Sequence, residues 1–232
     1  MRNIMFVGSW GESPSDMLRR YSNQTPKNSG VWEDLQGVSD AIYSAQTWWI
    51  NTPFDELCEL GYPKKTKKIS TITSGKSSMP AYVDRLNFLI DFCNNYDDID
   101  VYGRGTGPII PRHWKGELNY DSKCKLMGHI HYEYSLALEN IHYPNSWSEK
   151  PCDSILSWSL PIYSGASNFS EYFPEESFYQ IDVKKYDIKE IIEFISEPPS
   201  DVQVAALREA RELILYKYNI WPTIKSIIDG NS

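Results

Sequence analysis

The segment KISTITSGKSSMPAYVDRLNFLIDFCNNYDDIDVYG, residues 68–103, contains the pattern that decides the fold. Residues 69–73 alternate in polarity as a strand does, and this strand ends at Ser74-Gly75. Residues 82–93 place apolar side chains at helical spacing, and residues 99–102 predict a second strand. A strand, a helix and a strand in this order indicate a parallel crossover unit.

The same alternation continues in the second half of the chain. We expect strands at residues 134–138 and 160–163, with a helix between them from about residue 150 to 158. Further along, we expect a strand at residues 178–183 and helices at 188–195 and 202–218. The sequence therefore predicts an α/β fold with a doubly wound, Rossmann-type parallel sheet.

The 232 residues are enough for one large domain or two small ones. Residues 31–60 carry apolar and aromatic side chains at helical spacing and predict two helices, broken near residues 51–53. A charged connector with a turn signal follows at residues 61–68. We therefore expect a small N-terminal lobe over residues 1–65, a sheet domain over residues 66–200, and a C-terminal helical segment over residues 201–232 that packs back on the lobes.

The composition narrows the class of protein. A net charge of −8 and a pI near 5.1 oppose nonspecific nucleic-acid binding, which depends on clustered cations. The cysteines are widely spaced and form no CxxC pair, so they indicate neither a zinc module nor a redox dithiol. No apolar stretch approaches the roughly 20 residues that span a bilayer, and the N-terminal run IMFV is too short for a signal peptide. We expect a soluble, cytoplasmic protein without a transmembrane segment.

Residues 138–178, LENIHYPNSWSEKPCDSILSWSLPIYSGASNFSEYFPEESF, are the most informative for function. Ser146 and Glu149 have the spacing of a capping box, and Pro151 suits the first turn of a helix. The N–H groups of a helix N-terminus, together with the cation Lys150, suit a diphosphate, and Glu149 is able to accept hydrogen bonds from ribose hydroxyls. The alternative is that Glu149 only completes the cap and Lys150 is solvated. From these residues alone a plain cap is the more common arrangement.

Arg85 lies on the helix expected after Ser74-Gly75. The loop after a parallel strand opens at the carboxyl edge of the sheet, where ligands usually bind. An arginine at this edge is able to hold phosphate oxygens bidentately. The alternative is a surface arginine paired with Asp84 or Asp91.

Two patterns are superficially similar to metal sites. Asp98 and Asp100 precede a strand, so they should lie at the edge opposite the ligand crevice. His129 and His131 alternate on a possible strand beside Cys124, but no fourth ligand follows at zinc-finger spacing. We interpret the histidines as ordinary packed or surface residues and predict no metal site.

The segment from Ala137 to Phe178 resembles the motif of the α1,3/4-fucosyltransferases, glycosyltransferase family 10. That motif runs phenylalanine-glutamate-asparagine-serine, a spacer, then tyrosine-valine-threonine-glutamate-lysine, and here it is matched by LENI and SWSEK. The family's continuation resembles Ser164-Gly165, Phe173-Pro174 and Ser177-Phe178, and its upstream landmarks resemble residues 70–75, Arg85 and residues 99–103. The resemblance covers about residues 68–183.

The resemblance implies a GT-B-like fold with a reduced N-terminal lobe. It implies an inverting transfer of fucose from guanosine-diphosphate-fucose (GDP-fucose) to a glycan acceptor, with no cofactor required. The implied donor-binding residues are Arg85 and Lys150 on the diphosphate, Glu149 on the ribose, and Asn140, Ser146, Ser74, Gly75 and Tyr102 around them. The implied base is a glutamate of the N-terminal lobe, for which Glu12 is the candidate, although an exposed loop acid is the simpler interpretation of that residue.

The departures from the motif leave two alternatives open. Ser146, where the family has tyrosine, and Ile141, where it has serine, allow a different nucleotide sugar as donor. The poorly matching N-terminal lobe allows a noncatalytic relic that binds a nucleotide sugar or carbohydrate but has lost its base.

Overall fold

The computed structural model describes residues 48–118, 124–140, 142–145, 147–219 and 222 of the chain. Within these residues, six parallel strands form one sheet in the order β3-β2-β1-β4-β5-β6. The strands are β1 (Lys67–Ile72), β2 (Ile99–Tyr102), β3 (Trp114–Gly116), β4 (Tyr132–Leu138), β5 (Leu160–Ser164) and β6 (Tyr179–Gln180).

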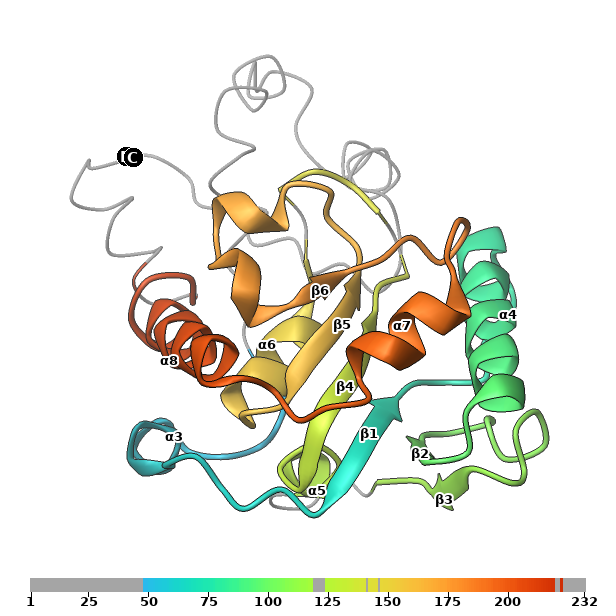
Figure 1. Ribbon diagram of the computed structural model, residues 1–232, viewed down its shortest axis with the longest axis horizontal. Coiled ribbons are helices and arrows are strands. Elements are labelled where there is room, and N and C mark those ends of the chain that lie inside the picture. Colours follow the sequence, from blue (N-terminus) through green and yellow to red (C-terminus); the bar gives the residue numbers. More distant parts are fainter. Residues whose placement is uncertain (1–47, 119–123, 141, 146, 220–221, 223–232) are drawn as a thin grey trace, which may run out of the picture. The chain divides into compact units, whose positions relative to one another are not determined.

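Helices flank this sheet (Figure 1). Helix α4 packs against α7, whereas α6 packs against β4, β5 and α8. The helices are α3 (Phe54–Glu59), α4 (Pro80–Asn95), α5 (Cys124–Met127), α6 (Glu149–Leu156), α7 (Ile188–Phe194) and α8 (Asp201–Tyr216), with short 3₁₀ turns at Phe169–Glu171 and Glu175–Ser177.

The strand order confirms the predicted Rossmann-type parallel sheet. The chain runs outward from β1 through β2 to β3, returns to the other side of β1, and runs outward again from β4 to β6. Ile69 of β1 therefore pairs with Ile99 on one side and with Tyr134 on the other. The direction of winding changes between β1 and β4, and open α/β sheets bind ligands at the carboxyl ends of the strands at such a point.

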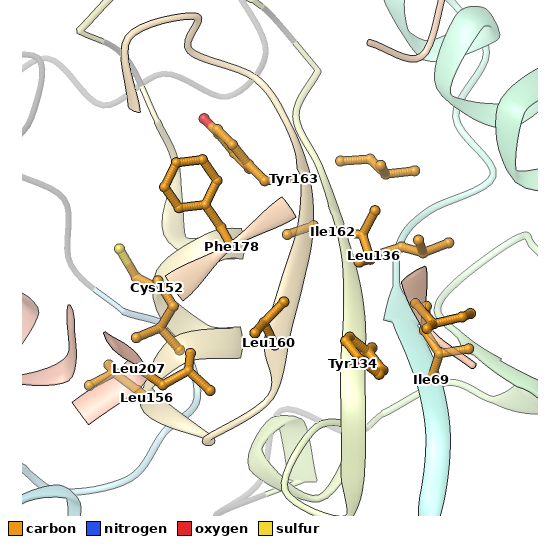
Figure 2. Close-up of a cluster of buried hydrophobic side chains, with 14 of the residues drawn as sticks. Ile69, Tyr134, Leu136, Cys152, Leu156, Leu160, Ile162, Tyr163, Phe178 and Leu207 are labelled. Atoms are coloured by element: carbon orange, nitrogen blue, oxygen red, sulfur yellow. The ribbon is translucent and has the colours of Figure 1, made fainter. Parts of the chain in front are cut away.

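The hydrophobic core lies around β4 and β5. Every residue of β5 is buried, as expected for a strand that is covered on both faces of a parallel sheet. Figure 2 shows side chains from the strands and from both α6 and α8 in this cluster, with Leu207 of α8 beside Leu156 of α6. Each such aliphatic side chain contributes about 1.5–3 kcal/mol when it is fully buried, so burial at this cluster holds α6 against the sheet.

The elements predicted from periodicity are present with small shifts of their ends. Strand β2 has its predicted bounds, and α8 begins one residue before the predicted start and ends two residues before the predicted end. Strand β6 has two residues, fewer than the predicted six at 178–183. Strand β3 was not expected, because Trp114 and Lys115 are both exposed and the three residues show no alternation of burial.

The predicted strand through His129 and His131 is wrong. Residues 128–131 form a turn, and β4 begins only at Tyr132. His129 is buried in this turn, where its Nδ1 lies 3.0 Å from the Ser135 hydroxyl. The interpretation of His129 as a packed histidine is confirmed.

Residues on either side of the expected sheet domain pack closely against it. The Trp158 indole donates to the Leu60 carbonyl at 2.8 Å, and Arg211 of α8 donates to the Leu156 carbonyl. Of the two helices expected over residues 31–60, α3 is described, and residues 31–47 lie outside the described part. The division of the chain at residues 65 and 200 stays a prediction. No described helix has both the length and the apolar character to cross a membrane.

Candidate nucleotide-binding site

Two loops meet at the point where the sheet changes its direction of winding. One follows β1 and contains Ser74, and the other follows β4 and contains Asn140. Arg85 of α4 connects them: its Nη2 donates to the Ser74 carbonyl at 2.8 Å, and its Nη1 donates to the Asn140 side-chain oxygen. The strand order thus brings together three residues that the sequence resemblance assigned to one site.

Arg85 is a buried cation, with 2% of its surface exposed. Burial lowers the pKa of its guanidinium, which nevertheless stays protonated at any physiological pH. Its Nε is buried without a hydrogen-bond partner among the described residues. The alternative of a surface pair is wrong, because Asp84 lies 3.5 Å from Lys184 and Asp91 accepts from Tyr186.

The loop after β1 is held by direct backbone contact with the loop after β2. The Gly75 N–H donates to the Arg104 carbonyl at 2.9 Å, and a Cβ on Gly75 would lie only 2.1 Å from the Gly105 carbonyl oxygen. A side chain at position 75 would therefore force the two loops apart. Gly75 shapes the loop that presents the Ser74 carbonyl to Arg85.

The Tyr102 hydroxyl does not point toward the two loops that Arg85 connects. The hydroxyl lies 2.8 Å from that of Tyr132, which donates to Asp100 at 2.7 Å. Tyr132 is the first residue of β4, so the Tyr102 hydroxyl is directed toward the amino ends of the strands. Asp100 is the second residue of β2 and does not precede it as predicted, but its carboxylate lies at this opposite edge, as expected.

Glu139, which belongs to the LENI motif but was given no role from the sequence, is the centre of the carboxyl-edge cluster. Its carboxylate is 5% exposed and accepts from the Ser148 N–H at 2.7 Å, from the Ser148 hydroxyl at 2.7 Å, and from Lys150 Nζ at 3.3 Å. The available signal was its place in that motif, directly after a predicted strand and before Asn140. A buried carboxylate with these donors fixes the start of α6.

Helix α6 begins two residues later than the capping-box pattern predicted. Its N-cap is Ser148, whose hydroxyl accepts from the Lys150 N–H at 3.3 Å, and not Ser146. Pro151 is in the first turn, as predicted, where the missing N–H breaks no helical hydrogen bond. The correction leaves Glu149 and Lys150 as the first two residues of the helix.

Glu149 and Lys150 are partly buried and paired, so neither is a freely solvated residue. Lys150 Nζ lies 3.3 Å from Glu139 and 3.8 Å from Glu149. Burial alone would lower the pKa of Lys150, but Glu139 and Glu149 more than offset it and the net shift is upward. Burial alone would raise the pKa of Glu149, and the cations Lys150 and Lys125 turn the net shift downward. Both groups are therefore ionised at neutral pH.

A groove of about 740 Å³ opens beside this cluster. It is lined in part by His142, Gly165, Tyr179 and Tyr186. Gly165 lies at the cluster itself, since a Cβ on it would be 2.7 Å from the Glu139 side chain. This volume is in the range of ligand pockets, roughly 300–1,000 Å³, but the described residues that line it do not include Arg85, Glu149 or Lys150.

Most of the candidate residues gather at one place. Ser74, Arg85, Asn140, Glu149 and Lys150 lie at the carboxyl ends of β1 and β4, with Gly75 shaping the loop, and the Tyr102 hydroxyl is directed away. Ser146 and Glu12 lie outside the described residues. Among the residues that the structure describes, no group of three or more His, Cys, Asp or Glu is arranged to hold a metal ion.

The fold and this cluster define a Rossmann-type domain with one buried and one partly buried cation, Arg85 and Lys150, at its ligand edge. The chain belongs to glycosyltransferase family 10, because the family model described as the C-terminal part of glycosyltransferase family 10 (fucosyltransferase) matches residues 62–203. No curated protein matches the sequence.

Several solved structures are similar to the chain. An α1,3-fucosyltransferase with GDP-fucose is 19% identical, with a TM-score of 0.44 over 77% of this chain and 51% of that one. The same enzyme type with GDP is 18% identical, with a TM-score of 0.45 over 77% and 53%. A point mutant of S. aureus TarM, in complex with UDP and other ligands, is 15% identical, with a TM-score of 0.47 over 73% and 36%. The chain spans about half the length of the α1,3-fucosyltransferase structures.

Proposed function

We propose that this chain binds a nucleoside-diphosphate sugar at the carboxyl ends of β1 and β4 and transfers the sugar to a glycan acceptor, with GDP-fucose as the donor. The observation that carries the proposal is the pair of cations, the buried Arg85 and the partly buried Lys150, at the winding change of a family 10 domain. Two fixed cations suit the two negatively charged groups of a diphosphate.

The partners of these cations support a role in binding. Arg85 keeps a buried Nε–H that no described residue accepts, so a ligand oxygen would satisfy a donor that folding leaves unpaired. Lys150 is held at the start of α6, where the helix N-terminus adds partial positive charge. In this proposal the adjacent, ionised Glu149 accepts hydrogen bonds from the ribose hydroxyls.

The proposed reaction is a direct displacement with inversion. The acceptor hydroxyl oxygen forms a bond to the anomeric carbon of the sugar while the bond from that carbon to the diphosphate oxygen breaks. The hydroxyl proton passes to a base, for which Glu12 is the proposed residue, and the nucleoside diphosphate leaves as an anion stabilised by Arg85 and Lys150.

Calorimetric titration tests the binding part of the proposal. GDP, GDP-fucose and a uridine-diphosphate sugar are titrated into the purified protein without added metal. We expect selective micromolar binding of the guanosine ligands, about −8 kcal/mol. Lys150→Met should weaken this binding by about 100-fold, whereas Lys189→Ala, at an exposed position of α7, should not change it.

The outcomes separate the donor and the enzyme claims. Selective binding of the uridine ligand would mean that the donor is a uridine-diphosphate sugar and not GDP-fucose. Absence of binding by all three ligands would contradict the proposed nucleotide-binding site. Donor binding without hydrolysis or transfer would identify a relic. Glu12→Gln should abolish transfer and leave donor affinity unchanged, and full retained activity would exclude Glu12 as the base.

A further inference from the structure

Lys125 connects the proposed ribose-binding residue to the protein interior. It lies on the short helix α5, remote in sequence from α6, and its Nζ is 3.8 Å from Glu149 Oε1 and 2.5 Å from Asp153 Oδ2. Together with the pairs of Lys150 with Glu149 and with Glu139, this makes a line of alternating charges from Asp153 to Glu139. Glu149 is the middle member of that line.

The geometry of α6 explains why a cation is needed at this place. Glu149 and Asp153 are four residues apart in the helix, so their side chains lie on the same face, where like charges repel. Lys125 reaches both carboxylates from outside the helix. It therefore balances two negative charges that would otherwise face each other.

Lys125 is itself held in a fixed position. Asp153 is fully buried and also accepts from the Trp49 N–H at 2.7 Å, so the carboxylate that anchors Lys125 is itself fixed. The Lys125 ammonium lies 5.9 Å from the centre of the Trp49 ring, within the range of a cation–π contact. An ammonium fixed in this way is able to fix the carboxylate on its other side.

We infer that Lys125 is a positioning residue that keeps the Glu149 carboxylate ionised and oriented to accept hydrogen bonds from the ribose hydroxyls of the nucleotide. This inference rests on the proposed function. Lys125 acts through Glu149, so its contribution to affinity depends on the ribose hydroxyls and not on the phosphates.

The test compares two variants that share the same change at Asp153. Lys125→Met alone would leave the Asp153 charge buried without its cation, which is enough to destabilise the fold for a reason unrelated to Glu149. Asp153→Asn keeps an oxygen for the Trp49 N–H and keeps Lys125, whereas Lys125→Met with Asp153→Asn removes the cation as well. The difference between these two variants isolates the action of Lys125 on Glu149.

The measured quantity is the ratio of the dissociation constants of 2′,3′-dideoxy-GDP and GDP. Since hydrogen bonds to a charged group are strong, we expect a ratio of about tenfold or more in the native protein. In Asp153→Asn, where Lys125 still faces Glu149 but its anchor has lost its charge, we expect a ratio of about fivefold. In Lys125→Met/Asp153→Asn and in Glu149→Gln, the ratio should fall to about twofold. The same ratio in both Asp153 variants would overturn the inference. Equal weakening of both nucleotides would also overturn it, because it would place Lys125 on the phosphates.

The pH dependence of the same ratio gives a second readout that a purely structural role would not change. The charged groups that face Glu149 are Lys125 and Lys150, with Asp153 one turn away on α6. Burial raises the pKa of Asp153 to about 6, and asparagine at position 153 in both variants removes that titration. Without Lys125, Glu149 should take up a proton more readily, so on acidification the ratio should fall at a higher pH in the double variant than in Asp153→Asn. Parallel profiles would contradict the inference.

Failure of the inference and failure of the proposed function are distinguishable. If the native protein binds neither nucleotide, the proposed function is overturned and the inference with it. If the native protein prefers GDP and the two Asp153 variants keep that preference equally, only the role of Lys125 is overturned.

Discussion

The two edges of the sheet carry charge networks that differ in burial. At the amino edge, Asp100 accepts from Lys67 at 2.8 Å and lies 3.3 Å from Lys115, and these lysine side chains are 48% and 46% exposed. At the carboxyl edge, Lys150 and Glu139 are 18% and 6% exposed. The first network is accessible to water, and the second is largely removed from it.

This difference indicates different roles for the two networks. Exposed ion pairs contribute about 0–1 kcal/mol, and water already solvates their charges. Burial of a charge costs free energy, and the attraction within a buried ion pair often only offsets that cost. A buried pair is therefore not explained by a gain in stability alone. Ligand binding provides a reason to place Arg85 and Lys150 in a dehydrated position, because electrostatic interactions with a diphosphate are stronger there.

The largest expected effect is on stability at Glu139. Glu139→Gln should lower the free energy of unfolding by about 3 kcal/mol, because it leaves Lys150 and the start of α6 without their buried carboxylate. Asp100→Asn at the amino edge should lower it by only about 1 kcal/mol. Urea denaturation of both variants measures the difference, and equal losses would remove the distinction between the edges.

The next largest effect is on nucleotide affinity at Arg85. Arg85→Lys keeps the charge but loses the planar fork that joins the Ser74 carbonyl to Asn140. We expect GDP affinity to fall by about 100-fold, or about 2.7 kcal/mol. Arg104→Lys, whose side chain is 77% exposed, is the matched control and should bind GDP as the native protein does. A similar loss in both variants would contradict a specific role for Arg85.

A smaller, pH-dependent effect is expected at His129. Burial, with the nearby cations Lys125 and Lys65, lowers the pKa of His129 to about 3. Below about pH 6.5 the unfolded chain binds a proton that the native protein does not, so this residue makes stability fall by about 1 kcal/mol between pH 6.5 and pH 5.5. His129→Asn, which keeps a polar group near Ser135, should flatten that slope in denaturation measured across this range. An unchanged slope would assign the acid sensitivity to other groups.

The smallest effect is expected from the exposed lysines of the amino edge. Lys67→Met should change the free energy of unfolding by less than about 1 kcal/mol, and it should leave GDP affinity unchanged. Thermal denaturation and calorimetry check both values. A clear loss of affinity would show that the amino edge takes part in binding.

Particular elements show what the sequence alone was able to predict. Strand β2 and helix α8 follow from periodicity, because their apolar side chains face one core. Strand β3 shows no apolar periodicity, because its residues are not buried in the core. It is a strand because its backbone pairs with β2. The turn at residues 128–131 was misread because its two histidines alternate in sequence although only His129 is buried.

The site was predictable only in part for a related reason. Motif resemblance selected Arg85, Asn140, Glu149 and Lys150, and the strand order then brought them together. Glu139 is the glutamate of the LENI motif but was given no role there, and Lys125 lies in no motif. Their importance depends on contacts between α5, α6 and the end of β4, which are remote in the sequence.

A crystal structure of this protein with bound GDP tests the central claim most directly. We expect the diphosphate oxygens within hydrogen-bond distance of Arg85 and Lys150, at the carboxyl ends of β1 and β4. A nucleotide bound elsewhere, with both cations still held by Asn140 and Glu139 alone, would contradict the account.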